Sequence, residues 1–336
     1  MARVAINGFG RIGRQVFKTM RTYYPDDLEI VAVNDLTNNN TLAHLLKYDS
    51  NYGRYEADIS ATENHIRVDD VELTSFQQRD WTQLPWADMG VDIVIESSSV
   101  GTDAKRARAH LEAGAKKVII SAPAKGEDKT LVYGVNHEEY DPENHHIISN
   151  ASCTTNALAL VAKVLFNQYG IRRGLVTTVH SYTNDQVILD APHEDLRRAR
   201  SGATNMIPTT TGAARALSLV LPEAKGKLDM FALRVPTPTV SLIDFVAELE
   251  RDVTVEEINN CFQELASGRL ERVVGYTEEP LVSSDFKEEN RTTVIDGLST
   301  MVIGGNMAKV VSWYDNEWSY SVRLADVVAM VAERGF

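Results

Sequence analysis

The chain has 336 residues, and its 43% hydrophobic and 24% charged residues match an average globular protein. The formal net charge of −13 disfavours nucleic acid and anionic membranes as partners. No run of about 18 apolar residues occurs and no signal-peptide pattern opens the chain, so neither a membrane span nor secretion is expected. Two cysteines cannot form a disulfide framework, which favours a cytoplasmic location.

The first 35 residues have the pattern of a strand, a glycine-rich turn, a helix and a second strand. Residues 3–7 form a short apolar run, and the turn that starts at Gly8 opens a helix that is expected to reach Tyr23. The next apolar run ends at Asp35. Downstream we expect a strand at 92–99, a helix at 102–114 with Thr102 as N-cap, a strand at 116–123, and strands in "TLVYGVN" and "HHIISN". This alternation predicts a parallel sheet with helical crossovers.

After about residue 150 the pattern changes. An apolar stripe at helical spacing over 154–167 predicts a helix packed on one face. The stretch "VSLIDFVAELE" alternates with a period of two, and "TMVIGGNMAKVVSWY" has the pattern of a hairpin that turns at Gly304-Gly305-Asn306. We therefore predict an α/β protein with a Rossmann-type domain at 1–150, followed by an α+β domain with a mainly antiparallel sheet.

The turn Gly8-Phe-Gly10-Arg-Ile-Gly13 indicates a dinucleotide site because its context also fits. Gly8 permits a tight turn, Gly10 lets the backbone approach a pyrophosphate, and Gly13 allows close packing of helix on strand. Asp35 would accept hydrogen bonds from a ribose 2′-hydroxyl and repel a 2′-phosphate, which favours NAD over NADP. The alternative is a glycine-rich turn beside a solvated aspartate.

Cys153 lies in the polar stretch "NASCTTNAL", at the start of the 154–167 helix, with Ser152 as a candidate N-cap. A helix N-terminus there would lower the pKa of the thiol, and His180, at the end of the strand "LVTTVH", could assist it. The alternatives are a small buried cysteine and a hydrogen-bonded strand-end histidine. Cys261 shares a helix face with apolar residues and is expected in the core. No spacing typical of a metal site occurs.

Groups suited to phosphate also recur. A Thr-rich stretch, 209–212, precedes a helix, Arg197, Arg198 and Arg200 are clustered in an acidic chain, and Arg234 ends a strand-like run. Together these residues favour a cleft for phosphate groups.

The segments "INGFGRIGR", "SNASCTTN", "HSYTNDQ", "IPTTTGAA", "RVPTPTVS" and "WYDNEW" occur in the order seen in the phosphorylating glyceraldehyde-3-phosphate dehydrogenases, which the chain resembles from end to end. The resemblance implies an NAD-dependent oxidoreductase of glycolysis and gluconeogenesis. It would convert glyceraldehyde 3-phosphate and inorganic phosphate to 1,3-bisphosphoglycerate through a cysteine hemithioacetal and a thioester. It also implies a homotetramer, a catalytic domain at 151–316, and a C-terminal helix, 317–336, that packs back on the first domain.

The resemblance assigns roles to single residues. Cys153 would be the nucleophile and His180 its base, and Asp185 would position Arg234. The implied NAD contacts, beside the three glycines, are Arg11, Ile12, Asp35, Arg79, Ser121 and Asn316. The implied phosphate contacts are Thr183 and Arg234 for the substrate and Ser152, Thr154, Arg198, Thr211 and Gly212 for inorganic phosphate.

Some positions depart from the family pattern. Ser99 and Gly101 stand where a glycine and an aromatic residue are usual, which should alter contacts with pyrophosphate and adenine. Ala157 replaces a second cysteine, so Cys153 has no partner four residues away for a protective disulfide. Ala191, in place of a usual leucine, would admit some NADP, but Asp35 argues for NAD with more weight. Two alternatives are an erythrose-4-phosphate dehydrogenase and a thiol redox sensor on the same scaffold.

Overall fold

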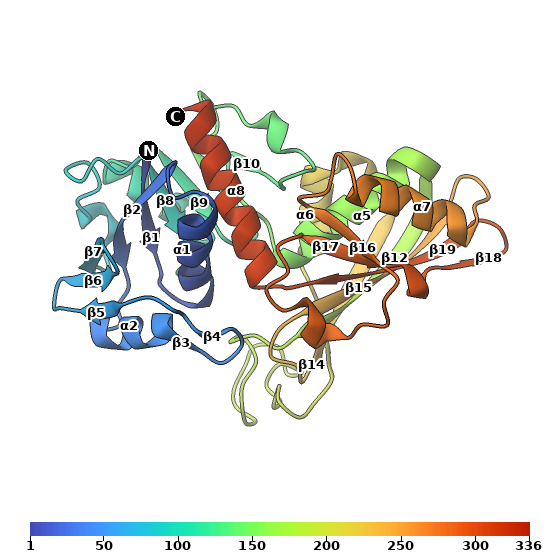
Figure 1. The fold of residues 1–336 in the computed structure, drawn as a ribbon, viewed down its shortest axis with the longest axis horizontal. Coiled ribbons are helices and arrows are strands. Elements are labelled where there is room, and N and C mark those ends of the chain that lie inside the picture. The colour runs from blue at the N-terminus through green and yellow to red at the C-terminus, as the bar shows by residue number, and fades with distance from the viewer. The chain divides into compact units, whose positions relative to one another are not determined.

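The computed structural model describes residues 1–336 and divides into two compact units. The first unit contains residues 1–131, 137–151 and 321–336, and the second contains 132–136 and 152–320. Figure 1 traces both units along the chain. No helix in the structure has the length and apolar character needed to cross a membrane.

The first unit is built on a nine-stranded sheet in the order β10-β11-β9-β8-β1-β2-β7-β6-β5. Its strands from β10 to β7 pair in parallel, whereas β7, β6 and β5 form antiparallel pairs at one edge. The bounds are β1 Ala2–Asn7, β2 Leu28–Asn34, β5 Ile59–Ala61, β6 His65–Val68, β7 Val71–Phe76, β8 Ile93–Glu96, β9 Lys117–Ile120, β10 Lys129–Thr130 and β11 Ile147–Ser149, with β3 Tyr48–Asp49 and β4 Gly53–Arg54 as a separate pair.

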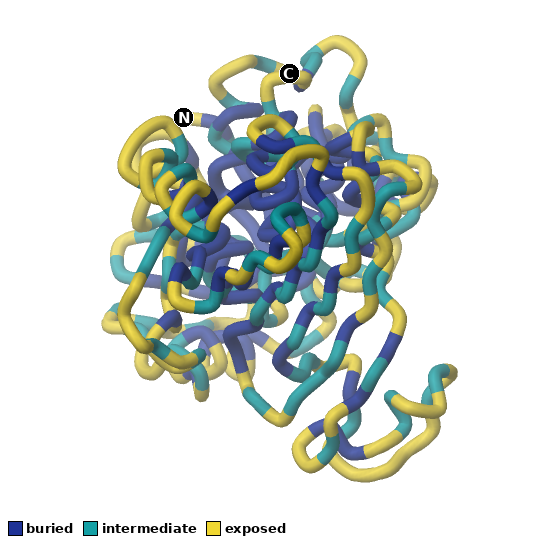
Figure 2. Tube along the Cα trace, turned by 90° about the vertical axis from the view of Figure 1, so that its right-hand side faces the viewer, coloured by how far each residue is buried: buried dark blue, intermediate teal, exposed yellow.

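Parallel strands must be joined by crossover connections, and helices provide such connections in this unit. They are α1 Arg11–Tyr23, α2 Asn39–Lys47, α3 Ala104–Ala107 and α4 Ala109–Glu112, with the short 3₁₀ turns Trp81–Gln83 and His137–Glu139. Every residue of β8 and β9 is buried, as expected for central strands covered on both faces. Figure 2 shows the buried residues gathered in the interior of the trace and the exposed ones mainly along its outer segments.

The second unit is built on an eight-stranded sheet in the order β13-β14-β12-β15-β19-β17-β16, with β18 paired to β19. Most pairs are antiparallel, and β12–β14 and β16–β17 are parallel. The bounds are α5 Cys153–Tyr169, β12 Ile171–Ser181, β13 Ile207–Thr209, α6 Ala213–Val220, β14 Leu228–Val235, β15 Ser241–Leu249, α7 Val255–Ala266, β16 Val274–Thr277, β17 Thr293–Asp296, β18 Met301–Ile303 and β19 Met307–Tyr314, with 3₁₀ turns at Pro222–Ala224, Ser283–Phe286 and Gly297–Ser299. The last helix, α8 Trp318–Arg334, falls mostly in the first unit, which contains residues 321–336.

One face of the second sheet is covered and the other is not. Figure 1 shows α5, α6 and α7 on the same side of it. In β15 the buried and half-buried residues alternate strictly, which confirms the period-two prediction. The hairpin at 304–306 is confirmed as the β18–β19 turn, where Gly304 and Gly305 both have positive φ. The predicted fold class is confirmed: a parallel, doubly wound sheet in one unit and a mainly antiparallel one in the other.

Three local predictions were wrong. The helix expected at 102–114 is two short segments, and its N-cap is Asp103, whose side chain accepts from the Lys105 amide. The stretch "TLVYGVN" adds only Thr130 to β10 and then turns. Cys261 is half-buried rather than in the core, because α7 turns it toward Tyr169.

Candidate active site

The glycine-rich turn between β1 and α1 has the geometry that each glycine was expected to provide. Gly8 has φ +92°, and a Cβ on it would lie 2.5 Å from the Ser98 backbone. A Cβ on Gly13 would lie 2.2 Å from the Gly8 carbonyl oxygen. A Cβ on Gly10 would meet nothing within 4 Å. Gly10 is also the N-cap of α1 and offers no side-chain hydrogen bond, so the positive helix end faces open space.

Asp35 lies at the carboxyl end of β2 and ties this strand to the turn. Its carboxylate accepts the Phe9 amide at 2.8 Å and the Thr37 amide at 2.9 Å. A carboxylate has about four acceptor positions. Two therefore remain for a diol such as the ribose hydroxyls.

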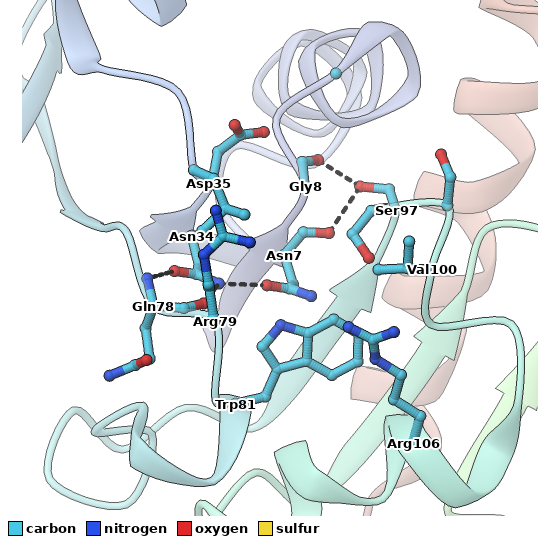
Figure 3. A pocket seen from close by; sticks show the side chains of 14 residues that line it. Asn7, Gly8, Asn34, Asp35, Gln78, Arg79, Trp81, Ser97, Val100 and Arg106 are labelled. Carbon is cyan, nitrogen blue, oxygen red and sulfur yellow. Dashed lines mark hydrogen bonds between the residues drawn. The ribbon is translucent and has the colours of Figure 1, made fainter.

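A cleft of about 350 Å³ opens between these elements in the first unit. Figure 3 shows Gly8 and Asp35 at one side of it, Arg79 and Trp81 at another, and Ser97, Val100 and Arg106 opposite. Of the predicted NAD residues, the structure brings together Gly8, Gly10, Asp35 and Arg79 here. Ser121 follows β9 and is not among the lining residues, and the Arg11 guanidinium binds Asp49 instead, at 3.1 Å.

A buried carboxylate, which the sequence analysis did not single out, underlies this cleft. Glu96 is 2% exposed and accepts from four donors: the Asn7 amide group, the Ser98 amide and hydroxyl, and His110 Nε2. Trp86 Nε1 donates to His110 Nδ1 at 3.1 Å, so the proton of His110 is on Nε2. These bonds hold the loop after β8 in place. Within it Ser99 has φ +68°, a region that glycine adopts more easily.

In the second unit, Cys153 is the first residue of α5. Ser152 is the N-cap, and its hydroxyl accepts the Thr155 amide at 3.0 Å. The residue before it, Ala151, has φ +56°. The backbone amides of Cys153 and Thr154 precede the first intrahelical bond, so they point out of the helix beside the thiol. This gives the nucleophile a local group of N–H donors.

His180 lies at the end of β12, with its Nε2 3.4 Å from the Cys153 sulfur. Its Nδ1 is 2.7 Å from the Ser181 carbonyl oxygen, which can only accept, and 3.0 Å from Arg234 Nη1, which can only donate. The shorter contact favours the tautomer with the proton on Nδ1, and Arg234 then donates to the Ser181 carbonyl instead, at 3.1 Å. The unprotonated Nε2 therefore faces the thiol.

The charge state of this pair differs from the prediction. Burial raises the pKa of the Cys153 thiol, although the Arg234 charge and the Thr154 hydrogen bonds oppose this rise. Burial, and then Arg234, lowers the pKa of His180 to about 3. The helix end was expected to lower the thiol pKa, and removal of the thiol from solvent acts in the opposite direction. Both shifts favour the neutral forms of the thiol and the imidazole, and His180 Nε2 is placed to accept the thiol proton.

Arg234 reaches this pair because β12 and β14 are parallel and in register, with His180 opposite Arg234. Its Nε is buried and has no hydrogen-bond partner. A buried, unsatisfied guanidinium N–H is costly unless a ligand accepts from it. Thr183 lies two residues after β12, and its backbone amide donates to the Gln186 side-chain oxygen at 2.9 Å.

Asp185 does not position Arg234, contrary to the prediction. Its carboxylate pairs with Arg198 and lies 3.5 Å from His193. Arg198 also donates to the Thr209 hydroxyl at 2.8 Å and the Thr210 carbonyl at 3.0 Å. Contacts with neighbouring residues of the same region therefore fix the position of Arg198, one of the residues predicted to bind inorganic phosphate. Thr211 and the exposed Gly212 precede α6, and a Cβ on Gly212 would meet nothing within 4 Å.

Two further predicted residues are fixed by hydroxyl groups. Asn316 Oδ1 accepts from Ser181 at 2.9 Å and from Ser241 at 3.0 Å, which leaves its NH₂ group as the free end of the amide. Thr154 is buried, with its hydroxyl 3.0 Å from that of Tyr314, which also lies 2.8 Å from the Thr178 hydroxyl. Sequence reasoning missed Tyr314, although it lies in the quoted motif "WYDNEW".

A dinucleotide cleft in one unit and a thiol–imidazole pair beside a buried arginine in the other define an NAD-dependent dehydrogenase that uses a cysteine nucleophile. Comparisons with known proteins agree. Residues 2–104 match the glyceraldehyde 3-phosphate dehydrogenase NAD binding domain, and residues 152–316 match the C-terminal domain of the same enzyme. The chain belongs to the glyceraldehyde-3-phosphate dehydrogenase family.

Individual relatives match over nearly the whole chain. It is 59% identical to the glyceraldehyde-3-phosphate dehydrogenase of Geobacillus stearothermophilus over 99% of both chains, and 56% identical to glyceraldehyde-3-phosphate dehydrogenase 1 of Bacillus cereus over 100% of both. The chain is therefore an NAD-dependent oxidoreductase that acts on glyceraldehyde 3-phosphate. The erythrose 4-phosphate and redox-sensor alternatives are not favoured.

Proposed function

We propose that Cys153 and His180 carry out this oxidation and that inorganic phosphate completes it. His180 Nε2 takes the thiol proton as the sulfur adds to the aldehyde carbon, which forms a hemithioacetal on Cys153. The contact that supports this step is the 3.4 Å distance between the two atoms. The protonated imidazole and the Cys153 backbone amide then face the new oxyanion, and the imidazole returns its proton to this oxygen, which restores neutral His180 and gives the hemithioacetal hydroxyl.

His180 next removes the hydroxyl proton of the hemithioacetal, and the carbon loses a hydride, which leaves a thioester on Cys153. Bound NAD supplies the acceptor for that hydride. Inorganic phosphate attacks the thioester carbon, the sulfur leaves as a thiolate, and the product is an acyl phosphate. A thiol suits both steps, since it attacks as a thiolate and leaves as one.

Two anion sites are needed, and the chain offers two groups of residues for them. Arg234, with its unsatisfied buried Nε, and Thr183 would hold the phosphate of the substrate. Ser152, Thr154, Arg198, Thr211 and Gly212 would receive inorganic phosphate. Thr154 can still donate one hydrogen bond if Tyr314 donates to it, since a hydroxyl both donates and accepts.

For NAD, the first-turn backbone of α1 at Arg11 and Ile12 would face the pyrophosphate beside Gly10. Asp35 would accept from the ribose, and the free NH₂ group of Asn316 would donate to the carboxamide. Arg79 and Ser121 would complete the contacts. Initial rates with NAD and with NADP on one preparation would measure the discrimination that Asp35 imposes.

We further propose the domain limits 1–150 for NAD binding, with the C-terminal helix 317–336 packed on it, and 151–316 for catalysis. A hydrogen bond from Tyr140 to the Gly335 carbonyl, 2.9 Å long, supports this place for the helix end. We also propose a homotetramer in the cytoplasm. Four large apolar residues of the 182–206 loop, all at least 71% exposed, support assembly: Ile188, Leu189, Leu196 and Met206.

The test is phosphate dependence. NADH formation from glyceraldehyde 3-phosphate should require inorganic phosphate for sustained turnover, and Cys153→Ser should abolish it while NAD binding persists. The matched control is Cys261→Ser, which changes the other thiol and should keep turnover. Sustained turnover without phosphate, or in Cys153→Ser, would contradict the mechanism.

A further inference from the structure

The dinucleotide cleft contains a layered group that the mechanism does not use. The Trp81 indole stacks on the His110 imidazole, with ring centroids 4.8 Å apart and 14° between the planes. The Arg106 guanidinium carbon lies 4.6 Å from the centroid of the Trp81 ring. We call these three residues the Trp81 stack. Trp81 and Arg106 both line the cleft, as Figure 3 shows.

The inner end of this stack is anchored. His110 is completely buried, with Trp86 on its Nδ1 and Glu96 on its Nε2. Trp81 itself is only 6% exposed, so its ring is covered by its neighbours. Arg106, by contrast, is exposed, and its guanidinium contacts the Trp81 ring without a hydrogen bond or ion pair to the protein. The guanidinium is therefore the surface that the stack presents to a ligand.

The position of the Trp81 stack in the cleft indicates which part of the dinucleotide it would contact. The pyrophosphate belongs at the Gly8–Gly10 turn, and the adenosine ribose belongs at Asp35. The base then occupies the part of the cleft beyond Asp35, where Trp81, Val100 and Arg106 lie. A planar guanidinium held against an indole is already oriented to stack on a second flat ring.

The loop after β8 cannot supply an aromatic wall for this base. A Cβ on Gly101 would lie 2.4 Å from the Glu96 side chain, which is itself fixed by four donors. An aromatic residue at 101 would therefore displace the buried carboxylate. The aromatic surface comes instead from Trp81, a residue of a different segment.

We propose that Arg106, held flat by Trp81 and His110, is the contact surface for the adenine base. This inference rests on the placement of the dinucleotide in this cleft proposed above. Arg106 is a binding residue, and Trp81 and His110 are positioning residues. The assignment concerns affinity and specificity for the base and leaves the chemistry at Cys153 unchanged.

The test measures binding by calorimetry on the full chain freed of dinucleotide, with AMP, nicotinamide mononucleotide, NAD and NADP as probes. Arg106→Met and Arg106→Lys should both weaken the binding of AMP and NAD by about threefold to thirtyfold, because neither side chain has the planar guanidinium group. Binding of nicotinamide mononucleotide should not change. Arg108→Met, an exposed arginine two residues away, is the matched control and should bind all four probes like the unmodified chain.

Other outcomes would overturn the proposal. Unchanged AMP binding in Arg106→Met excludes a base contact, and an equal loss in Arg108→Met shows a general charge effect. If Arg106→Lys binds AMP as tightly as the unmodified chain, or if only the binding of NADP is weakened, Arg106 acts as a point charge on phosphate rather than as a surface for the base. Trp81→Leu should also weaken the binding of AMP, whereas Trp81→Phe should retain most of the affinity for AMP. Phosphate-dependent turnover is measured in a separate assay, so a failure of the proposed mechanism can be distinguished from a failure of the proposed base contact.

Discussion

The guanidinium of Arg234 acts on both members of the catalytic pair. Its charge opposes the rise in the pKa of the Cys153 thiol that burial causes, which favours the nucleophile, and it adds to the lowering of the pKa of His180, which weakens the base. A substrate phosphate on Arg234 would neutralise this charge. His180 would then become a stronger base only when substrate is bound, which couples binding to proton transfer.

Removing the base should slow chemistry without preventing substrate binding. For His180→Asn we expect kcat to fall about 10²- to 10⁴-fold with little change in KM. The gap between the variant and the unmodified enzyme should narrow as the pH rises, because hydroxide then removes the thiol proton. Steady-state rates across a pH series check this, and a gap that stays constant would contradict the role of His180 as base.

The same histidine should make the protein sensitive to acid. Unfolded, His180 takes up a proton near pH 6.5, whereas in the fold its pKa is about 3. Between these values the unfolded state binds the extra proton, so stability falls as the pH drops, by up to about 1.4 kcal/mol per pH unit.

Denaturant titrations at about pH 7 and about pH 4.5 measure this loss. His180→Asn should lose less stability between the two values than the unmodified chain. The control His44→Asn, which changes an exposed histidine, should keep the full acid sensitivity. An equal loss in all three proteins would show that His180 does not contribute.

Ser99 is a residue in a conformation that suits glycine. Its φ of +68° costs a residue with a Cβ about 1 kcal/mol, so Ser99→Gly should stabilise the protein by about that amount. Urea unfolding measures the change. Ser60→Gly, at an exposed position in β5, is the control and should destabilise, because glycine is entropically costly in a strand.

At the scale of elements, two glycines of the β1–α1 turn have different roles: Gly10 leaves room for a ligand, and Gly13 leaves room for the packing of the turn itself. Gly10→Ala has room and an ordinary φ of −74°, so the melting temperature should stay the same while the methyl group fills the space for the pyrophosphate. We expect NAD binding to weaken at least about tenfold. Gly13→Ala should instead destabilise the fold, since its methyl group meets the Gly8 carbonyl. Comparable melting temperatures for the two variants would contradict this.

The sequence predicted the elements whose signals are local. The glycine turn, the Ser152 cap and the β18–β19 hairpin each rest on a few adjacent residues, and the structure has all three. The resemblance supplied the partners of Cys153, which are far apart in the chain. Spacing alone could not have paired them.

The predictions that were wrong depend on long-range contacts. Asp185 binds Arg198 rather than Arg234 because the 182–206 loop folds on itself. The Glu96 network joins residues of strands β1 and β8, helix α4 and the loop after β8, and no local pattern marks it. The raised thiol pKa follows from burial, which a helix position cannot reveal.

At the scale of the whole molecule, the exposed apolar side chains of the 182–206 loop bear on assembly. Ile188 and Leu189 are 81% and 77% exposed. A variant with both changed to Asp should form a smaller assembly by light scattering, because desolvating two carboxylates at an interface is costly. The control pair Met301→Asp and Ile303→Asp, exposed on β18, should leave the assembly intact. An unchanged mass in the loop variant would place the interface elsewhere.

Trp81 is also a fluorophore held between a cation and an imidazole, within a cleft that a ligand fills. Its emission depends on the polarity and electron-accepting groups around it, and a base that covers Arg106 changes both. The chain therefore contains its own optical reporter of cleft occupancy. With the other three tryptophans at positions 86, 313 and 318 replaced by phenylalanine, the remaining signal could follow dinucleotide arrival in real time, with no attached dye.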